Sequence, residues 1–181
     1  MPESVTVNGE TCYLKTDFKR WITFELILTD PNIVEQAKLA AMLPLCLKKL
    51  PSNIDVAVEA CLKFYSGKDN LPLQHEKSVS KPLYSFLYDA ELIYSAFMSQ
   101  YGIDLSGNNM HWYKFRALFK GLKPDNKISE VMQIRGTNLS DIKDDDKRRK
   151  YQSLKRYWAI PDIRSMQEKD SEIVQAVEQL F

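Results

Sequence analysis

Apolar residues recur at intervals of three and four positions between Leu83 and Tyr101. This spacing places them on one face of an α-helix. The face comprises Leu83, Phe86, Leu87, Ala90, Ile93, Tyr94, Phe97 and Tyr101, and a second stripe of Tyr84, Tyr88 and Leu92 widens it. A helix with so wide an apolar face contacts several neighbours. We therefore expect a mainly α protein built around a helix over residues 83–101, which ends at Gly102.

The same reasoning predicts helices on both sides of this central helix. The signal for a helix start is a capping residue, in one case followed by proline, or a cluster of acidic residues. Glycine or proline ends or bends several of them. The expected ranges are 16–26 with Thr16 as the cap, 31–44, 54–65, 110–120, 128–134, 144–158 and 163–180. Together they predict a single-domain, multi-helix bundle of about seven or eight helices.

The N-terminus departs from the helical pattern. Val5 and Val7 alternate with polar residues, and the chain returns over residues 11–14. Between them, Asn8-Gly9 tolerates the positive φ angles of a two-residue turn. A small N-terminal β-hairpin is therefore expected.

Composition along the chain suggests how it is divided. Glycine, proline and polar residues gather over residues 66–82, which lack helical periodicity. We expect a helical domain with its hairpin over residues 1–160, with a sub-boundary near 66–82. Residues 161–181 are expected to form a C-terminal amphipathic helix.

Charge and cysteine content narrow the class of protein. The chain has 25 Lys and Arg against 24 Asp and Glu, a net charge of +1, whereas non-specific nucleic-acid binders have a large positive excess. Three cysteines suit a reducing compartment better than a disulfide framework. No apolar segment approaches the ~20 residues that span a bilayer, and the N-terminus lacks the features of a signal peptide. We expect a cytosolic protein that does not bind membranes.

The residues offer no constellation for catalysis. The sequence contains no Walker loop, no dinucleotide-binding fingerprint, no nucleophile elbow and no Cys-x-x-Cys pair. A Cys61–His75 pair is the nucleophilic arrangement left open, and His111 fits a helix start or the interior. Asp89 and Glu91 are two positions apart, so they point to different sides of a helix. The sequence therefore predicts a protein that is not an enzyme and that binds no metal or cofactor.

Two oppositely charged helices are expected near the C-terminus. Residues 141–158 contain seven bases against four acids, and residues 162–181 contain two bases against five acids. The basic run 147–150, with Lys155 and Arg156, either contacts phosphate or is a solvated face. We favour the solvated face because three acids adjoin the run.

The last helix has an apolar seam typical of helix pairing. Asp170 interrupts this seam. The helix either meets the preceding basic helix, within one chain or between chains, or packs on its own core. The candidate self-association or partner residues are Ile163, Met166, Ile173, Val177 and Leu180.

Two central stretches resemble a bacteriophage family. The first is 88–97 with 100–105, and the second is 111–118 with Gly121-Leu122 and Ile134-Arg135 after it. They resemble the "gene product fifteen" proteins of tailed phages and prophages of Gram-positive bacteria. The N-terminal part is also similar, at Asn8-Gly9, 16–18, Trp21, Phe64-Tyr65 and Gly67. The resemblance covers residues 5 to 160.

This resemblance implies a tail assembly chaperone of the host bacterial cytoplasm. Such chaperones coat the helical tape measure protein, leave as tail tube subunits polymerise around it, and are absent from the finished virion. The implied partners are the tape measure protein, the tail tube protein and further copies of the chain. Two alternatives stay open: a structural tail component retained in the virion, and a helical nucleic-acid-binding or regulatory protein.

The residues of the motif form the candidate site. Its apolar members are expected in the core rather than at a partner contact. Its charged members either pair internally or face a partner, and an internal carboxylate–guanidinium pair is favoured because Arg is a two-pronged donor. The set is Asp89, Glu91, Tyr94, Phe97, Tyr101, Trp112, Phe115, Arg116 and Arg135.

Overall fold

The structure is a computed structural model that describes residues 1–67 and 82–161. In these ranges it contains one two-stranded sheet and seven α-helices. The predicted mainly α fold with a small N-terminal hairpin is confirmed. The elements are β1 (Ser4–Val7), β2 (Glu10–Tyr13), α1 (Phe18–Thr29), α2 (Glu35–Cys46), α3 (Ile54–Ser66), α4 (Ala90–Tyr101), α5 (Trp112–Lys120), α6 (Lys127–Gly136) and α7 (Asp145–Tyr157), with a short 3₁₀ helix over Leu139–Asp141.

Strands β1 and β2 form the predicted antiparallel hairpin. The turn residues Asn8 and Gly9 both have positive φ, 50° and 82°, which a two-residue hairpin turn requires. Val7 and Cys12 are buried, and β1 packs on α3. The hairpin thus packs on α3.

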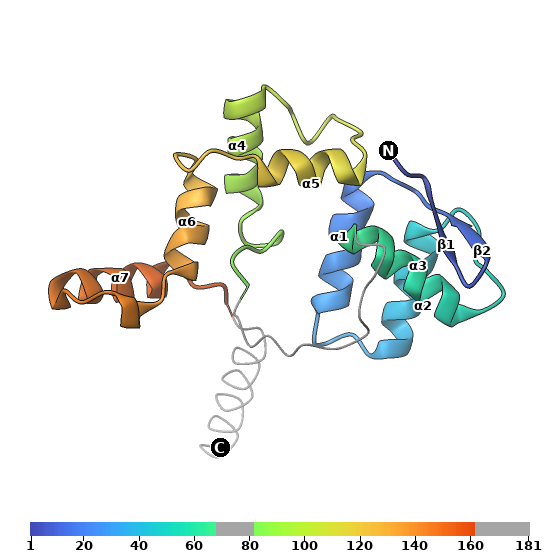
Figure 1. The fold of residues 1–181 in the computed structure, drawn as a ribbon, viewed down its shortest axis with the longest axis horizontal. Helices are drawn as coiled ribbons and strands as arrows, with labels where there is room; N and C mark the ends of the chain where they lie inside the picture. The colour runs from blue at the N-terminus through green and yellow to red at the C-terminus, as the bar shows by residue number, and fades with distance from the viewer. Residues whose placement is uncertain (68–81, 162–181) are drawn as a thin grey trace, which may run out of the picture.

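Helix α5 links the two sides of the molecule. Figure 1 shows the hairpin with α1, α2 and α3 on one side, and α4, α6 and α7 on the other. Phe115 of α5 is fully buried between them. Its ring stacks on Phe18 of α1 at 4.8 Å and on Phe97 of α4 at 5.1 Å. One core of aromatic side chains is therefore continuous from α1 to α4.

The prediction of a helix over residues 83–101 is wrong for its first part, because α4 begins only at Ala90. Residues 86–88 form a turn instead. The Asp89 carboxylate accepts a hydrogen bond from the Ser85 backbone N–H at 2.8 Å, and this local bond competes with a continuous helix. As a result Leu87 is 56% exposed, and the apolar stripe does not form one helical face.

Two other helix starts differ from their predictions. The cap of α1 is Asp17 rather than Thr16, and the Asp17 carboxylate accepts from the backbone N–H two residues later at 3.0 Å. Asp30 caps the end of α1 and forms a turn of its own, so α2 begins at Glu35. Pro44 lies inside the last turn of α2, which ends two residues later.

The remaining starts and ends agree closely with expectation. Helix α3 begins after Asn53, which caps it, and ends at Gly67 in the left-handed region. Gly102 ends α4 in the same way. The helix predicted over 163–180 lies outside the described residues, as does most of the 66–82 connection. No helix within 1–67 and 82–161 has both the length and the apolar character needed to cross a membrane.

Candidate functional site

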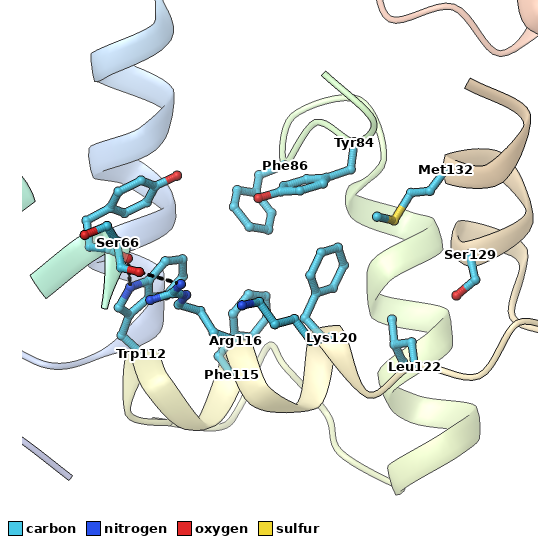
Figure 2. A pocket seen from close by; sticks show the side chains of 12 residues that line it. Ser66, Tyr84, Phe86, Trp112, Phe115, Arg116, Lys120, Leu122, Ser129 and Met132 are labelled. Atoms are coloured by element: carbon cyan, nitrogen blue, oxygen red, sulfur yellow. Dashed lines mark hydrogen bonds between the residues drawn. The ribbon is translucent and has the colours of Figure 1, made fainter. Parts of the chain in front are cut away.

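A groove of about 500 Å³ lies where α3, α5 and α6 meet the segment that precedes α4. Figure 2 shows Arg116 and Lys120 extending from α5, with Tyr84 and Phe86 facing them and Met132 pointing in from α6. We call this the aromatic groove. Among the described residues that line it there is no carboxylate. These residues are Tyr65, Ser66, Tyr84, Phe86, Trp112, Phe115, Arg116, Phe119, Lys120, Leu122, Ser129 and Met132.

The base of the groove belongs to the core. Phe115 and Trp112 are 0% and 3% exposed, and their rings stack at 5.8 Å. Phe119 stacks on Phe115 at 6.1 Å and is only partly buried. The groove therefore presents aromatic surface that the packed core already holds in place.

The C-terminus of α3 forms one wall. The indole Nε1 of Trp112 donates to the Tyr65 carbonyl at 3.0 Å, and Arg116 Nη2 donates to the Ser66 carbonyl at 2.8 Å. The last carbonyls of a helix lack intrahelical partners and form the negative end of its dipole. Arg116 is thus a guanidinium placed at a helix C-terminus. It makes no carboxylate pair within the described chain.

Gly67 allows this contact, and its replacement by alanine is expected to be costly. A Cβ at Gly67 would lie 2.5 Å from Arg116 Nη1, and the residue has φ of +66°. The left-handed backbone alone costs about 1–2 kcal/mol for a residue with a side chain. Gly102 is a matched control because it has φ of +65° with no atom near its would-be Cβ.

Urea unfolding of the two alanine variants separates these effects. We expect Gly67→Ala to lower the free energy of unfolding by more than Gly102→Ala does, because only the former displaces Arg116. Equal losses would show that Arg116 moves aside without cost and would contradict its role in this wall.

The opposite wall comes from the segment before α4. The rings of Tyr84 and Phe119 meet edge to face at 5.0 Å, and Phe86 lies 5.9 Å from Phe115. These contacts exist because the chain turns over residues 86–88 instead of continuing as helix. The turn that the sequence did not predict therefore builds this wall.

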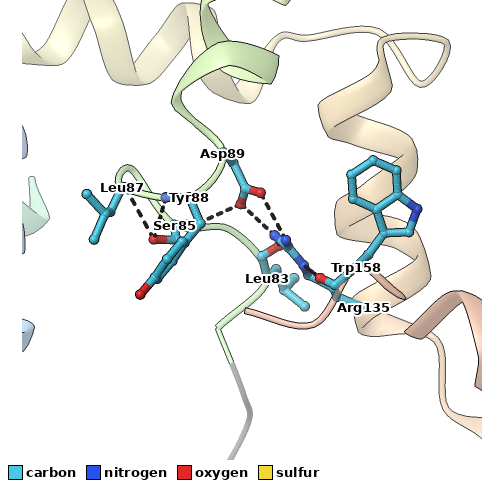
Figure 3. A network of polar contacts seen from close by, with 7 residues as sticks. All are labelled: Leu83, Ser85, Leu87, Tyr88, Asp89, Arg135 and Trp158. Carbon is cyan, nitrogen blue, oxygen red and sulfur yellow. Dashed lines mark hydrogen bonds and ion pairs between the residues drawn. The ribbon is translucent and has the colours of Figure 1, made fainter. Parts of the chain in front are cut away.

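A buried ion pair fixes that turn, as Figure 3 shows. Asp89 is 3% exposed. The Arg135 guanidinium donates to its two carboxylate oxygens at 2.5 and 2.9 Å. Arg135 also donates to the carbonyls of Leu83 at 3.0 Å and Trp158 at 2.6 Å. One side chain of α6 thus joins the segment before α4 to the residues after α7.

Glu25 and Tyr65 form a second polar pair beside the groove. The Tyr65 hydroxyl donates to the Glu25 carboxylate. Burial raises the pKa of Glu25, and the Tyr65 hydrogen bond opposes this. Burial, reinforced by the Glu25 charge, raises the pKa of Tyr84 to about 12. Both tyrosines are therefore neutral hydroxyls near pH 7.

The Glu25 shift predicts a pH dependence of stability. Its folded pKa exceeds the unfolded value of roughly 4.3, so the folded state holds more protons just above that pH. Stability is then lost as pH rises from the unfolded pKa through the folded one. The melting temperature of Glu25→Gln, relative to that of the parent chain, should therefore increase progressively as pH rises from about 4. A difference in melting temperature that is constant with pH would contradict the shift.

The structure separates the motif residues into four sets. Trp112, Phe115 and Arg116 line the groove, and Asp89 pairs with Arg135 behind it. Phe97 is fully buried in the core, and Tyr101 donates its hydroxyl to the Leu118 carbonyl at 2.9 Å. Glu91 and Tyr94 belong to neither site and face outward.

Tyr94 was expected in the interior, and this is wrong, because it is 38% exposed. Helix α4 buries only Ile93, Ala96 and Phe97. With no helical turn before Ala90, the apolar stripe narrows and Tyr94 falls at its edge. The sequence did not identify Tyr84 and Phe86 as site residues. Their spacing is helical, so it did not predict the turn that places them in the groove.

The basic run lies on a solvated helix. Helix α7 has no buried residue, and Arg148 and Arg149 pair with Asp145 and Asp146 one turn earlier. Lys155 instead donates to the carbonyls of Arg135 and Thr137 at 2.7 and 2.6 Å. Two of the four bases in the run therefore already form ion pairs within their own helix.

The residues considered for nucleophilic or metal chemistry have structural surroundings. His111 caps α5, and its Nδ1 accepts from the Tyr113 backbone N–H at 3.1 Å. Cys61 is buried beside Cys46, whose pKa is raised by a hydrogen bond between the two thiols and by burial. His75 lies outside the described residues. Across residues 1–67 and 82–161 there is no group of His, Cys, Asp and Glu suited to a metal ion.

Comparison with known proteins gives one match. A family model described as "Bacteriophage Gp15 protein" matches residues 1–160. That range contains the whole aromatic groove and the Asp89–Arg135 pair. No curated protein and no solved structure matches the chain.

Proposed function

The chain belongs to the bacteriophage Gp15 family, and from that premise we propose that it is a non-enzymatic tail assembly chaperone that binds and coats the tape measure protein. Membership indicates a bacteriophage structural or assembly protein. The finer role is a proposal, supported by the aromatic groove.

The groove has the chemistry of a site for an amphipathic helix. Helices with an apolar face bind in hydrophobic grooves through side chains spaced at three and four positions. Aromatic walls accept such side chains, and a volume of about 500 Å³ holds several of them. Arg116 and Lys120 are four positions apart on α5, so both project to the same side. They favour a partner helix with acidic residues beside its apolar face.

Repetition along a rod strengthens such contacts. One groove of this size supplies a modest affinity, but copies bound in a row gain avidity from linked sites. In this account the chain acts in the host bacterial cytoplasm, neighbouring copies contact each other along the tape measure protein, and they leave as tail tube subunits polymerise.

Solubility of the tape measure protein tests this role. The tape measure protein is expressed in bacteria alone and together with this chain, and the soluble fraction is measured by affinity purification. We expect the tape measure protein to remain soluble only in the co-expression and to bind this chain. An insoluble tape measure protein in both cultures would contradict the chaperone role.

The composition of the finished particle tests the main alternative. A chaperone that leaves during tube assembly should be missing from purified virions when their proteins are analysed by mass spectrometry. Its stoichiometric presence in the particle would identify it as a structural tail component instead.

Salt dependence distinguishes the nucleic-acid alternative. Because Arg148, Arg149 and Lys155 of α7 have local partners, we expect no DNA binding with a steep dependence on salt. A steep decrease in affinity with added salt would show several phosphate contacts and would favour a nucleic-acid-binding role.

A further inference from the structure

We propose that residues 162–181 bind the aromatic groove of their own chain as an acidic amphipathic helix, so that a partner must displace them. The binding itself does not depend on the identity of that partner. Its regulatory consequence rests on the proposed function.

The groove and this segment have complementary chemistry. The described lining of the groove is aromatic and includes two cations but no carboxylate. No carboxylate in the described parts of the chain pairs with Arg116 or Lys120. Residues 162–181 contain five acids, two bases and an apolar seam that includes Ile173 and Val177. Their spacing predicts a helix of the kind the groove accepts.

Asp170 is the residue of this segment that most specifically fits the groove. It occupies the seam between Met166 and Ile173, where an apolar residue would be expected. A carboxylate on an apolar face is costly to bury unless a cation meets it. Arg116 is a cation within an aromatic groove, stacked over Trp112 at 5.8 Å. A guanidinium–carboxylate contact in the groove accounts for an acid at this position.

The chain leaves the described structure close to the groove. Trp158 is three residues before the last described residue, and its carbonyl accepts from Arg135. The same guanidinium binds the carbonyl of Leu83, the neighbour of groove residue Tyr84. Met132, another lining residue, is one helical turn before Arg135. A segment tethered this near its site has a high effective concentration there.

Helix α7 is a weaker site for the same segment. It is basic, but two of its arginines already pair with its own acids, and exposed pairs of this kind contribute little. The observations therefore favour the groove over α7.

Paramagnetic broadening in the full chain tests the proposal without a partner. A nitroxide is attached to Gln175→Cys, on the side of the predicted helix away from the seam, and methyl resonances of the chain are recorded. The three native thiols are buried, and the unsubstituted chain treated with the same reagent is the control. We expect loss of the Met132 methyl signal, whereas Met42 in α2 and Leu154 in α7 keep theirs.

Mixed samples and seam variants make the result specific. When labelled chains and isotope-marked chains are separate molecules, the Met132 signal should survive. Asp170→Lys should restore the signal within one chain, and Glu168→Lys, with the same charge change off the seam, should not. Neither variant alters the described core, so both keep the fold intact.

Each other result overturns the proposal. Loss of the Met132 signal in the mixed sample as well would assign the groove to a second copy. Loss at Leu154 alone would assign the segment to α7, and no loss in either sample would exclude docking. Addition of tape measure protein then restores the Met132 signal if the proposed function holds. Broadening that persists unchanged would leave the docking established and contradict the proposed partner.

Discussion

Replacing Arg135 with alanine is expected to lower the free energy of unfolding by about 3–5 kcal/mol. This corresponds to a fall in melting temperature on the order of 10 °C for a chain of this size. The variant leaves the Asp89 carboxylate buried without its cation. It also removes the donors to the carbonyls of Leu83 and Trp158. Thermal and urea unfolding measure the loss.

Two controls separate the buried pair from charge loss in general. Arg148→Ala removes an arginine whose pair with Asp145 is exposed, and such pairs contribute about 1 kcal/mol or less. In a double-mutant cycle, adding Asp89→Asn to Arg135→Ala should cost little more than either change alone. Equal, small losses for Arg135→Ala and Arg148→Ala would contradict the structural role of the pair.

Replacing Met132 with glutamate is expected to weaken binding of the tape measure protein at least about tenfold. A factor of ten requires 1.4 kcal/mol, and an unpaired carboxylate in an apolar site costs more than that. Met132 lines the groove and is only partly buried, so the variant should fold. Circular dichroism verifies the fold, and co-purification with the tape measure protein measures binding.

Met98→Glu is the matched control for this variant. Met98 lies on α4, is 40% exposed and does not line the groove. We expect Met98→Glu to bind as the parent chain does. If Met98→Glu loses binding while Met132→Glu keeps it, the partner surface is the exposed face of α4 around Tyr94, and the groove is not the site.

Elements set by local signals were predictable from the sequence. The hairpin follows from Asn8-Gly9, whose positive φ angles suit few other residues. Helix α3 follows from the Asn53 cap, the apolar spacing after it and the Gly67 terminator. In these cases the residues that decide the structure are neighbours in the chain.

The start of α4 depends on a residue far along the chain. The spacing from Leu83 to Tyr101 is helical, but Arg135, 46 positions after Asp89, holds the Asp89 carboxylate and the Leu83 carbonyl. A long-range ion pair thus overrides local periodicity. The sequence suggested that an arginine of the motif pairs with a carboxylate, but it did not reveal that this pair ends the helix.

The aromatic groove was not predictable for the same reason. Its residues come from α3, the segment before α4, α5 and α6. Trp112 and Phe115 have the spacing of core residues and are indeed buried. Only the turn before α4 brings Tyr84 and Phe86 over them and leaves an open space between. Arg116 was expected to meet a carboxylate, whereas it binds the Ser66 carbonyl at the rim.

The mass of the complex with the tape measure protein tests the central claim most directly. The two proteins are co-expressed, purified through a tag on the tape measure protein, and measured by light scattering. We predict a soluble complex with many copies of this chain for each tape measure protein, and few or none when the chain has the Met132→Glu change. Absence of co-purification, or a complex of the same mass with Met132→Glu, would contradict the binding of a tape measure helix in the aromatic groove.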